Sequence, residues 1–341
     1  MPLRSMVNSS SATNPIDVVE AAYDLEADDG AWLRRVVELV RPLVDRGRGV
    51  LGYTFELPLA SAMWLPQHVF LGMSAAEAGA YEAMATAGLR NGITRPMHVD
   101  PEALGSMQET ASRNHLGPKL VASTLLAPLA RLRIRDVIAL RTVEPGGKGI
   151  VIAGPSAEDL HVDRRAKRLW SRVAAHLAAG RRLRAAMSED GIEAILTPSG
   201  KLDDARGDAA SRSARAALRD AVARIEGARG RARRTEPERA TEAWTALVAG
   251  RWSLVDRFER GGRRFVVARK NPHGLADPRG LGERERAIAH LAALGKSNKL
   301  IAYELGLAES TIATHLASAM RKLRARSRVD LVRLLAALGR P

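Results

Sequence analysis

The chain lacks cysteine, long apolar runs and a leader-like N-terminus. With no cysteine among its 341 residues, it cannot form disulfides, thiolate zinc sites, iron–sulfur clusters or a cysteine nucleophile. Its longest apolar stretch, residues 120–130, contains Ser, Thr and Pro and is too short to span a bilayer. Residues 1–15 lack the apolar core that a signal peptide needs. We therefore expect a soluble, cytoplasmic protein with no membrane partner.

Lysine is also scarce, so the positive net charge is weaker evidence for a nucleic-acid partner than its size suggests. The formal net charge is +15, and a basic surface suits a polyanion such as nucleic acid. However, only eight of the 53 basic residues are Lys, and Arg together with Ala fills whole segments, as a GC-rich genome would produce without selection for charge. Charge alone is therefore weak support for a nucleic-acid partner.

The sequence contains no catalytic or metal-binding pattern. There is no GxxxxGK[ST] phosphate loop and no HExxH pair, and the histidines are scattered without metal-ligand spacing. Ser199 lies in Pro-Ser-Gly rather than in a GxSxG elbow. We expect no enzyme activity, no catalytic residues, no metal and no cofactor.

The length favours two or three domains, because single cores rarely grow beyond about 250–300 residues. We predict a multidomain fold, with an α+β N-terminal region followed by an all-α domain. The predicted parts are a disordered tail (1–28), a first α+β domain (29–187), a second α+β domain (188–270), a Pro- and Gly-containing linker (271–280) and a helical domain (281–341).

Hydrophobic periodicity predicts the elements of the two α+β domains. Apolar residues at helical spacing indicate helices, β-branched and aromatic runs indicate strands, and adjacent glycines indicate hairpin turns. In the first domain these signals predict helices over 31–45, 74–89 and 160–187, a strand over 49–56, and a hairpin of 137–143 with 149–152. In the second they predict a strand over 192–196, a turn over 197–201, a helical run over 205–247 broken at Gly227, Gly230 and Pro237, and a hairpin of 252–258 with 263–268 about Gly261-Gly262.

Four amphipathic segments follow from Leu281. The first, residues 284–294, stops at a glycine, and the second, residues 297–305, has Ser297 as its N-cap. Only Gly306-Leu307-Ala308 separates the second segment from the third, residues 309–324. A short Gly-containing turn between two amphipathic helices is what a helix-turn-helix requires.

The third segment has a polar face that predicts a recognition helix for double-stranded DNA. Small hydroxyl side chains near its N-terminal end allow a close approach to base edges, and the cations further along can contact phosphates. The candidate DNA-binding residues are Asn298, Lys299, Ser310, Thr311, Thr314, His315, Ser318, Arg321 and Lys322.

The fourth segment carries an apolar stripe. It opens at Ser327 with Asp330 three residues on, close to a capping box. The stripe either closes the helical domain or contacts a second copy of the chain. Because the domain is small and the stripe reaches the last turns, we predict a homodimer contact through Leu331, Leu334, Leu335 and Leu338.

These features together resemble the LuxR-type helix-turn-helix family over about 60 residues. The matching residues are Leu281, Arg284-Glu285-Arg286, Ser297-Asn298-Lys299, Ile301-Ala302, Leu305-Gly306-Leu307, Thr311-Ile312, Thr314-His315-Leu316, Arg321-Lys322-Leu323 and Arg326-Ser327-Arg328. The resemblance implies a four-helix DNA-binding domain that acts as a dimer on two half-sites about one helical turn, ~34 Å, apart. It leaves RNA polymerase open as a further partner.

The chain departs from the family pattern at four places. Gly282-Glu283 stands where Thr-Pro is usual, and Leu300 replaces a Glu that would complete a capping box with Ser297. Ala308 replaces the usual Ser cap of the third helix, and Ala313 stands where the family commonly has Lys. The departures predict weaker helix caps and one DNA contact fewer than in relatives.

The order of predicted elements upstream resembles a degenerate GAF-like domain and a divergent PAS-like half. These resemblances rest on layout alone and imply no ligand, so a small-molecule or protein signal stays open. A phosphoacceptor receiver would need an acidic pair after its first strand, whereas Asp28-Asp29 precedes a helix. Only 13 residues are aromatic, which argues against an acyl-homoserine-lactone sensor.

The leading hypothesis is therefore a sequence-specific transcription regulator with an N-terminal sensory region. Two alternatives compete with it. The first is a ligand-binding or protein-interaction adaptor whose last four helices only dimerise, which Ala308 and Ala313 keep open. The second is a sigma factor, whose upstream half should be all helical. The strands predicted at 49–56 and within 252–268 contradict that second alternative.

Overall fold

The chain divides into two compact units in a computed structural model. The model describes residues 5–7, 13–57, 65–90, 93–144, 147–185, 191–244, 246–248, 251–258, 264–270, 281–323 and 325–338. The first unit comprises Met1–Thr13 with Ala27–Ala174, and the second comprises Asn14–Glu26 with Ala175–Gly339. Within the described residues, no helix is long and apolar enough to cross a membrane.

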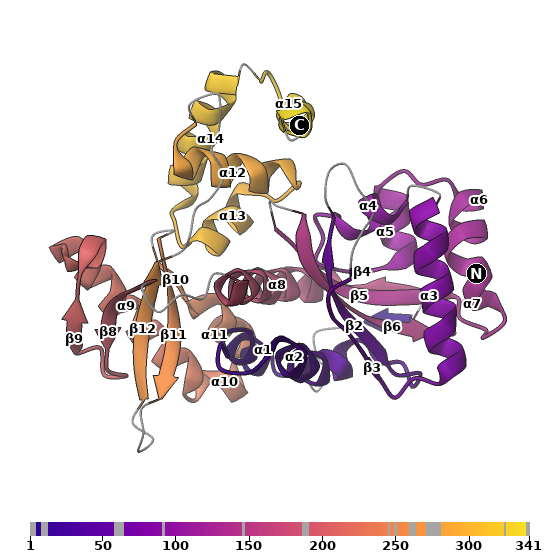
Figure 1. Cartoon of the computed structure of the whole chain (residues 1–341), viewed down its shortest axis with the longest axis horizontal. Helices are drawn as coiled ribbons and strands as arrows, with labels where there is room; N and C mark the ends of the chain where they lie inside the picture. The colour runs from indigo at the N-terminus through magenta and orange to yellow at the C-terminus, as the bar shows by residue number, and fades with distance from the viewer. Residues whose placement is uncertain are drawn as a thin grey trace. The chain divides into compact units, whose positions relative to one another are not determined.

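A five-stranded antiparallel sheet forms the centre of the first unit (Figure 1). Its strand order is β3 (His68–Leu71), β2 (Val50–Glu56), β6 (Lys148–Ser156), β5 (Asp136–Val143) and β4 (Leu104–Ser106). The strand predicted over 49–56 and the hairpin predicted around residue 146 are confirmed by β2 and by the antiparallel β5–β6 pair. The apolar strands β5 and β6 are almost entirely buried, so they carry the core of this unit.

Helices cover both faces of this sheet. Helix α2 (Asp29–Val44) packs against β2, β3 and β6 and buries Trp32, Val36 and Val40. The other face is covered by α3 (Ala75–Arg90), α4 (Thr94–His98), α5 (Met107–Arg113), α6 (Pro118–Val121), a π-helical turn (Ala122–Leu126) and α7 (Ala127–Ala130). The helices predicted over 31–45 and 74–89 are thus confirmed as α2 and α3.

Several short elements of the first unit were not predicted. β3 and β4 have only four and three residues. A small parallel pair joins β1 (Ser5–Val7) to β7 (Leu160–Val162). The long helix predicted from residue 160 therefore begins later, as α8 (Arg164–Ala185), which continues into the second unit.

The second unit contains another five-stranded antiparallel sheet. Its order is β10 (Leu247–Val248), β11 (Trp252–Phe258), β12 (Arg264–Lys270), β8 (Ile192–Leu196) and β9 (Leu202–Ala205). The predicted strand over 192–196 and the predicted pairing of 252–258 with the following strand are confirmed. The Gly261-Gly262 turn and the linker 271–280 lie outside the described residues.

The helical run predicted over 205–247 is only partly correct. A 3₁₀ turn (Gly207–Ala210) precedes α9 (Arg212–Arg229), α10 (Ala232–Thr235) and α11 (Pro237–Ala243). The predicted break at Gly227 is wrong, because α9 passes through it and ends at Gly230. Pro237 begins α11, as expected of a residue that fits the first helical turn.

The prediction of a disordered tail over residues 1–28 is wrong for helix α1 (Pro15–Ala22). Its N-cap Asn14 accepts a hydrogen bond from the Ile16 N–H at 3.0 Å, and Ile16, Val18 and Val19 are fully buried. Arg229 donates to Glu20 at 3.0 Å, and Arg233 binds Asp17 and Glu20. This helix belongs to the second unit, and its partners come from about 210 residues further along the chain, so no local pattern indicates them.

The four predicted C-terminal helices are present as α12 (Glu283–Ala293), α13 (Asn298–Leu305), α14 (Glu309–Leu323) and α15 (Arg328–Leu338). The second compact unit therefore holds the second sheet together with these helices. The two units do not coincide with the domain boundaries predicted at residues 28 and 187, because residues 14–26 belong to the second unit and α8 spans both.

Candidate DNA-binding site

The helix-turn-helix is formed by α13 and α14 around a shared apolar core. Ile288 of α12, Ile301 of α13, Ile312 of α14 and Leu331 of α15 are fully buried together in this core. Each lies on the apolar stripe of its helix, so the predicted periodicity corresponds to real burial. The core fixes the orientation of α14 relative to the other three helices.

Local signals set the geometry of the turn. The Ser297 hydroxyl accepts a hydrogen bond from the Leu300 N–H at 3.2 Å, which confirms the predicted N-cap of α13. Gly306 adopts φ +62°, a left-handed conformation that favours glycine, and the Leu307 N–H donates back to the Ala302 carbonyl at 2.9 Å. The predicted three-residue turn, 306–308, is therefore confirmed.

The face of α14 opposite the core is polar and accessible. Thr314 and Arg321 are exposed, while Thr311, His315 and Ser318 are half-buried. The Thr314 hydroxyl donates to the Ser310 carbonyl at 2.9 Å, and Arg321 donates to the Ser318 hydroxyl at 3.2 Å. These are hydrogen bonds within the helix, so the outer surfaces of the side chains stay available to a partner. Ala308 and Ala313 are also exposed, and neither can supply a side-chain hydrogen bond.

Lys322 differs from the other candidate DNA-binding residues because it is held by a carboxylate. Its Nζ lies 2.7 Å from Glu285 Oε2, and the same oxygen accepts from the Gly282 N–H at 2.8 Å. Burial raises the pKa of Glu285, but hydrogen bonds from Lys322, Ser318 and Gly282 outweigh it and lower that pKa to about 2. Lys322 thus ties α14 to α12. The bond to Gly282 compensates in part for the missing Thr at the start of α12.

The two candidates on α13 have different surroundings. Lys299 is exposed at the start of the helix, where it can contact a phosphate. Asn298 accepts a hydrogen bond from Arg328, which also donates to the Lys296 carbonyl at 3.1 Å. Asn298 therefore helps to attach α15 to α13, a role that the sequence pattern does not indicate.

The predicted dimerisation stripe on α15 points mostly into its own domain. Leu331 is fully buried and Leu335 is 9 % exposed in the core, and Leu334 packs against that core. The surfaces of Leu331 and Leu335 are covered by the same chain, and the dimer contact predicted through this stripe stays a prediction. The side chain of Leu338 lies outside the described residues. Among the side chains of α15 that the structure describes, the exposed large apolar ones are Val329 and Val332, at 60 % and 43 % exposure.

A buried ion cluster joins α13 to α8. The Glu304 side chain is fully buried; it lies 2.6 Å from Lys296 Nζ and 3.4 Å from Arg182 Nη1. Burial raises the pKa of Glu304, but the two cations outweigh this effect and keep that pKa below its usual value. No periodicity or spacing in the sequence indicates this cluster, since Arg182 is more than 100 residues away.

A chain of hydrogen bonds lies beside this cluster. Tyr303 donates to the Thr241 carbonyl of α11 at 2.6 Å and lies 2.9 Å from His176 Nε2 on α8. His176 Nδ1 lies 2.9 Å from the Tyr23 hydroxyl. Burial lowers the pKa of His176 to about 3, so the imidazole is neutral near pH 7. No group of three or more His, Asp or Glu side chains that could hold a metal is found in the described part of the chain.

The comparisons with known proteins agree with this geometry. Residues 279–335 match the family described as bacterial regulatory proteins, luxR family (GerE). The chain is 38 % identical over 105 residues to nodulation protein W of Bradyrhizobium diazoefficiens, covering 31 % of this chain and 43 % of that protein. It is 33 % identical over 90 residues to the transcriptional regulatory protein FixJ of Rhizobium meliloti, covering 25 % and 44 %.

The segment 279–335 is therefore a LuxR-family helix-turn-helix domain. The chain spans less than half the length of these two curated relatives. The likeness thus identifies the C-terminal domain, and the helices that it covers are α12, α13, α14 and most of α15.

Proposed function

We propose that this protein is a sequence-specific DNA-binding transcription regulator, with α14 as its recognition helix. The observation that carries the proposal is the division of α14 into two faces. Its apolar residues are buried in a four-helix core, while Thr311, Thr314, His315, Ser318 and Arg321 occupy the other face. A helix of this kind can enter the major groove with its polar face against base edges. The luxR-family match and a relative named as a transcriptional regulator support the same function.

Each candidate contact has a distinct task in this proposal. Thr311, Thr314 and His315 contact base edges, because they lie in the N-terminal half of α14 and carry short donors and acceptors. Arg321 and Lys299 contact phosphates, as flexible exposed cations do. Lys322 contributes less, because its charge is already paired with Glu285.

We also propose that the protein forms a homodimer, but through a different surface of α15 from the leucine stripe predicted from the sequence. We place the contact on the outer face of α15, where Val329 and Val332 are exposed, rather than on the buried leucines. Two such domains would contact half-sites about one helical turn, ~34 Å, apart.

We further infer that the upstream region is sensory and non-enzymatic. Its support is the layout of the first unit, in which helices lie on both faces of an antiparallel sheet, as a GAF-like domain requires. The PAS-like assignment of the second sheet is supported only by its strand order and the helices beside it.

Gel-shift titration of the intact chain against operator DNA selected from a random pool tests the proposal. The variant with His315→Ala and Arg321→Ala should bind the selected site at least tenfold more weakly, because each lost base or phosphate contact costs about 1–3 kcal/mol. Arg224→Ala is the matched control, since it removes an exposed arginine on α9 and should leave binding unchanged. Binding without sequence preference that is insensitive to the double change would overturn the proposal.

A further inference from the structure

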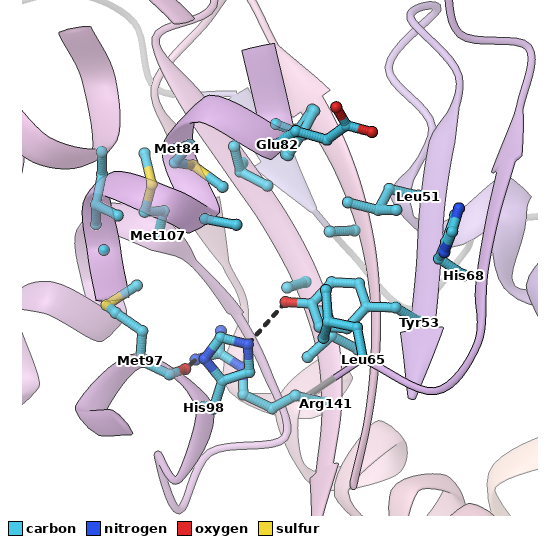
Figure 2. A pocket seen from close by; sticks show the side chains of 18 of the residues that line it. Leu51, Tyr53, Leu65, His68, Glu82, Met84, Met97, His98, Met107 and Arg141 are labelled. Atoms are coloured by element: carbon cyan, nitrogen blue, oxygen red, sulfur yellow. Dashed lines mark hydrogen bonds between the residues drawn. The ribbon is translucent and has the colours of Figure 1, made fainter. Parts of the chain in front are cut away.

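The first unit contains a cavity of about 400 Å³ between its sheet and the helices α3, α4 and α5 (Figure 2). Cavities of this size are typical of small-molecule sites. All of its lining residues belong to the first unit, so the site is complete within it.

Strand register explains why the cavity exists. Side chains alternate between the two faces of a strand, and only odd-numbered residues of β2, β5 and β6 line the cavity. One row across the sheet is Leu51, Ala153 and Ala139, and the next is Tyr53, Val151 and Arg141. The two adjacent alanines leave the middle of the floor unfilled, while the tyrosine and the arginine stand on either side of Val151.

The walls of the cavity are mostly apolar and adaptable. Met84, Met97 and Met107 come from three different helices, and methionine adapts readily to the shape of a ligand. Leu65 also lines the cavity and is 36 % exposed, which is unusual for a large apolar side chain in the described residues. Glu82, another lining residue, is exposed as well, so solvent reaches the cavity.

One end of the cavity is polar. The Tyr53 hydroxyl lies 2.8 Å from His98 Nε2 (Figure 2). Arg141 is only 4 % exposed, and its guanidinium donates to two backbone carbonyls, of Met97 at 3.0 Å and of Gly105 at 3.4 Å. In the described part of the chain, no carboxylate lies within ion-pair distance of Arg141. Asp100, the acid with the largest electrostatic influence on it, is already bound by Arg113 at 2.9 Å.

The hydroxyl of Tyr81 also faces the question of a partner, because none is found for it in the described part of the chain. Tyr81 of α3 lines the cavity and is 3 % exposed, and its hydroxyl has no hydrogen-bond partner among the described residues. Buried hydroxyls are almost always hydrogen-bonded, so this one indicates a missing partner. A ligand with an acceptor group would satisfy it.

We propose that this cavity binds a small hydrophobic monocarboxylate. The apolar body lies on Ala139 and Ala153 between the methionines, and the carboxylate accepts hydrogen bonds from Arg141 and from the Tyr81 hydroxyl. An anion is favoured over a neutral polar end because the buried Arg141 charge has only neutral carbonyls as direct partners. This ligand would be the signal for the proposed sensory region. Its binding to the cavity does not depend on the proposed function, but any effect of the ligand on DNA binding does.

The test measures ligand binding by the full chain without DNA, so its outcome is independent of the DNA-binding proposal. Benzoate, cinnamate, naphthoate and octanoate are each compared with the corresponding neutral amide, by thermal shift and calorimetry. At least one carboxylate should raise the melting temperature and bind about tenfold or more tightly than its amide. Ala139→Phe, which fills the floor, should abolish that binding. Tyr81→Phe, which removes only the unpaired hydroxyl, should weaken it about tenfold.

Three results would overturn the proposal. They are no melting shift with any of the four carboxylates, equal affinity for the amides, or full binding by a folded Ala139→Phe variant. If Ala139→Phe does not fold, the Arg141→Gln variant is tested instead with each carboxylate and its neutral amide. In that variant the preference for carboxylate over amide should disappear, and a preference that persists contradicts the proposal.

Discussion

His176 shows how a single residue can connect the helix-turn-helix to the rest of its unit. The one proton of the Tyr303 hydroxyl is donated to the Thr241 carbonyl, so the Tyr303 oxygen must accept from His176 Nε2–H. His176 Nδ1 then accepts from the Tyr23 hydroxyl. This arrangement needs the neutral imidazole with its proton on Nε2, and burial keeps the ring neutral near pH 7 because it lowers the pKa of His176 to about 3.

This assignment predicts a pH dependence of stability. The pKa of His176 is about 3 in the folded chain and near 6.5 when unfolded, so its contribution is fully present above pH 6.5 and is lost as the pH falls toward 3. Between pH 7 and pH 5 the free energy of unfolding should fall by about 2 kcal/mol because of this residue. In urea unfolding, the free energy of unfolding of His176→Gln should therefore fall by about 2 kcal/mol less than that of the wild type between pH 7 and pH 5. His68→Gln, which changes an exposed histidine, should behave like the wild type. An unchanged pH dependence in His176→Gln would rule out the assignment.

Residues with local roles were predictable from sequence, and those with distant partners were not. Ser297 and Gly306 act on backbone groups within five positions, so their types and spacing indicate the cap and the turn. Glu304 acts by pairing with Arg182, and Asn298 acts by accepting a hydrogen bond from Arg328. Only the folded chain brings these distant residues together. The same reason explains Lys322, whose place on the polar face gives no sign of Glu285.

At the scale of elements, length decided which predictions succeeded. Long amphipathic helices such as α2 and α14 have several turns of periodicity, and β2 and β5 have seven and eight residues. β4 and β10 have three and two residues and exist because a neighbouring strand pairs with them. α15 was predicted correctly as a helix, but its apolar stripe could not reveal whether the leucines face the domain core or a second chain.

The ion cluster that attaches α13 to α8 predicts that the isosteric change Glu304→Gln strongly lowers the free energy of unfolding. Glu304→Gln removes the charge between Lys296 and Arg182 and leaves Lys296, only 9 % exposed, without its partner. The free energy of unfolding should fall by about 3 kcal/mol or more. Asp220→Asn is the matched control, because it breaks an exposed pair with Arg224 and should cost less than about 1 kcal/mol. Equal effects of the two changes in denaturant unfolding would contradict the structural role of this cluster.

At the scale of the whole molecule, the proposed dimer would assemble on DNA through the outer face of α15. Val329→Asp combined with Val332→Asp places two charges on the exposed apolar surface and should convert a dimer to a monomer, as sedimentation velocity would reveal. Binding to a two-half-site operator should weaken, while binding to a single half-site should not. Melting should change little, because neither valine is in the core. Dimers that persist in this variant would exclude the α15 surface as the contact.

The central claim is that α14 distinguishes DNA sequences, and its most direct measurement is a competition titration of the intact chain. The affinity for the selected operator is measured against a scrambled duplex of equal length at several fixed salt concentrations. We predict a preference for the operator of at least a thousandfold that collapses when His315 and Arg321 are both changed to Ala, while salt-dependent nonspecific binding largely remains. Equal affinity for the two duplexes, at every salt concentration, would contradict the claim.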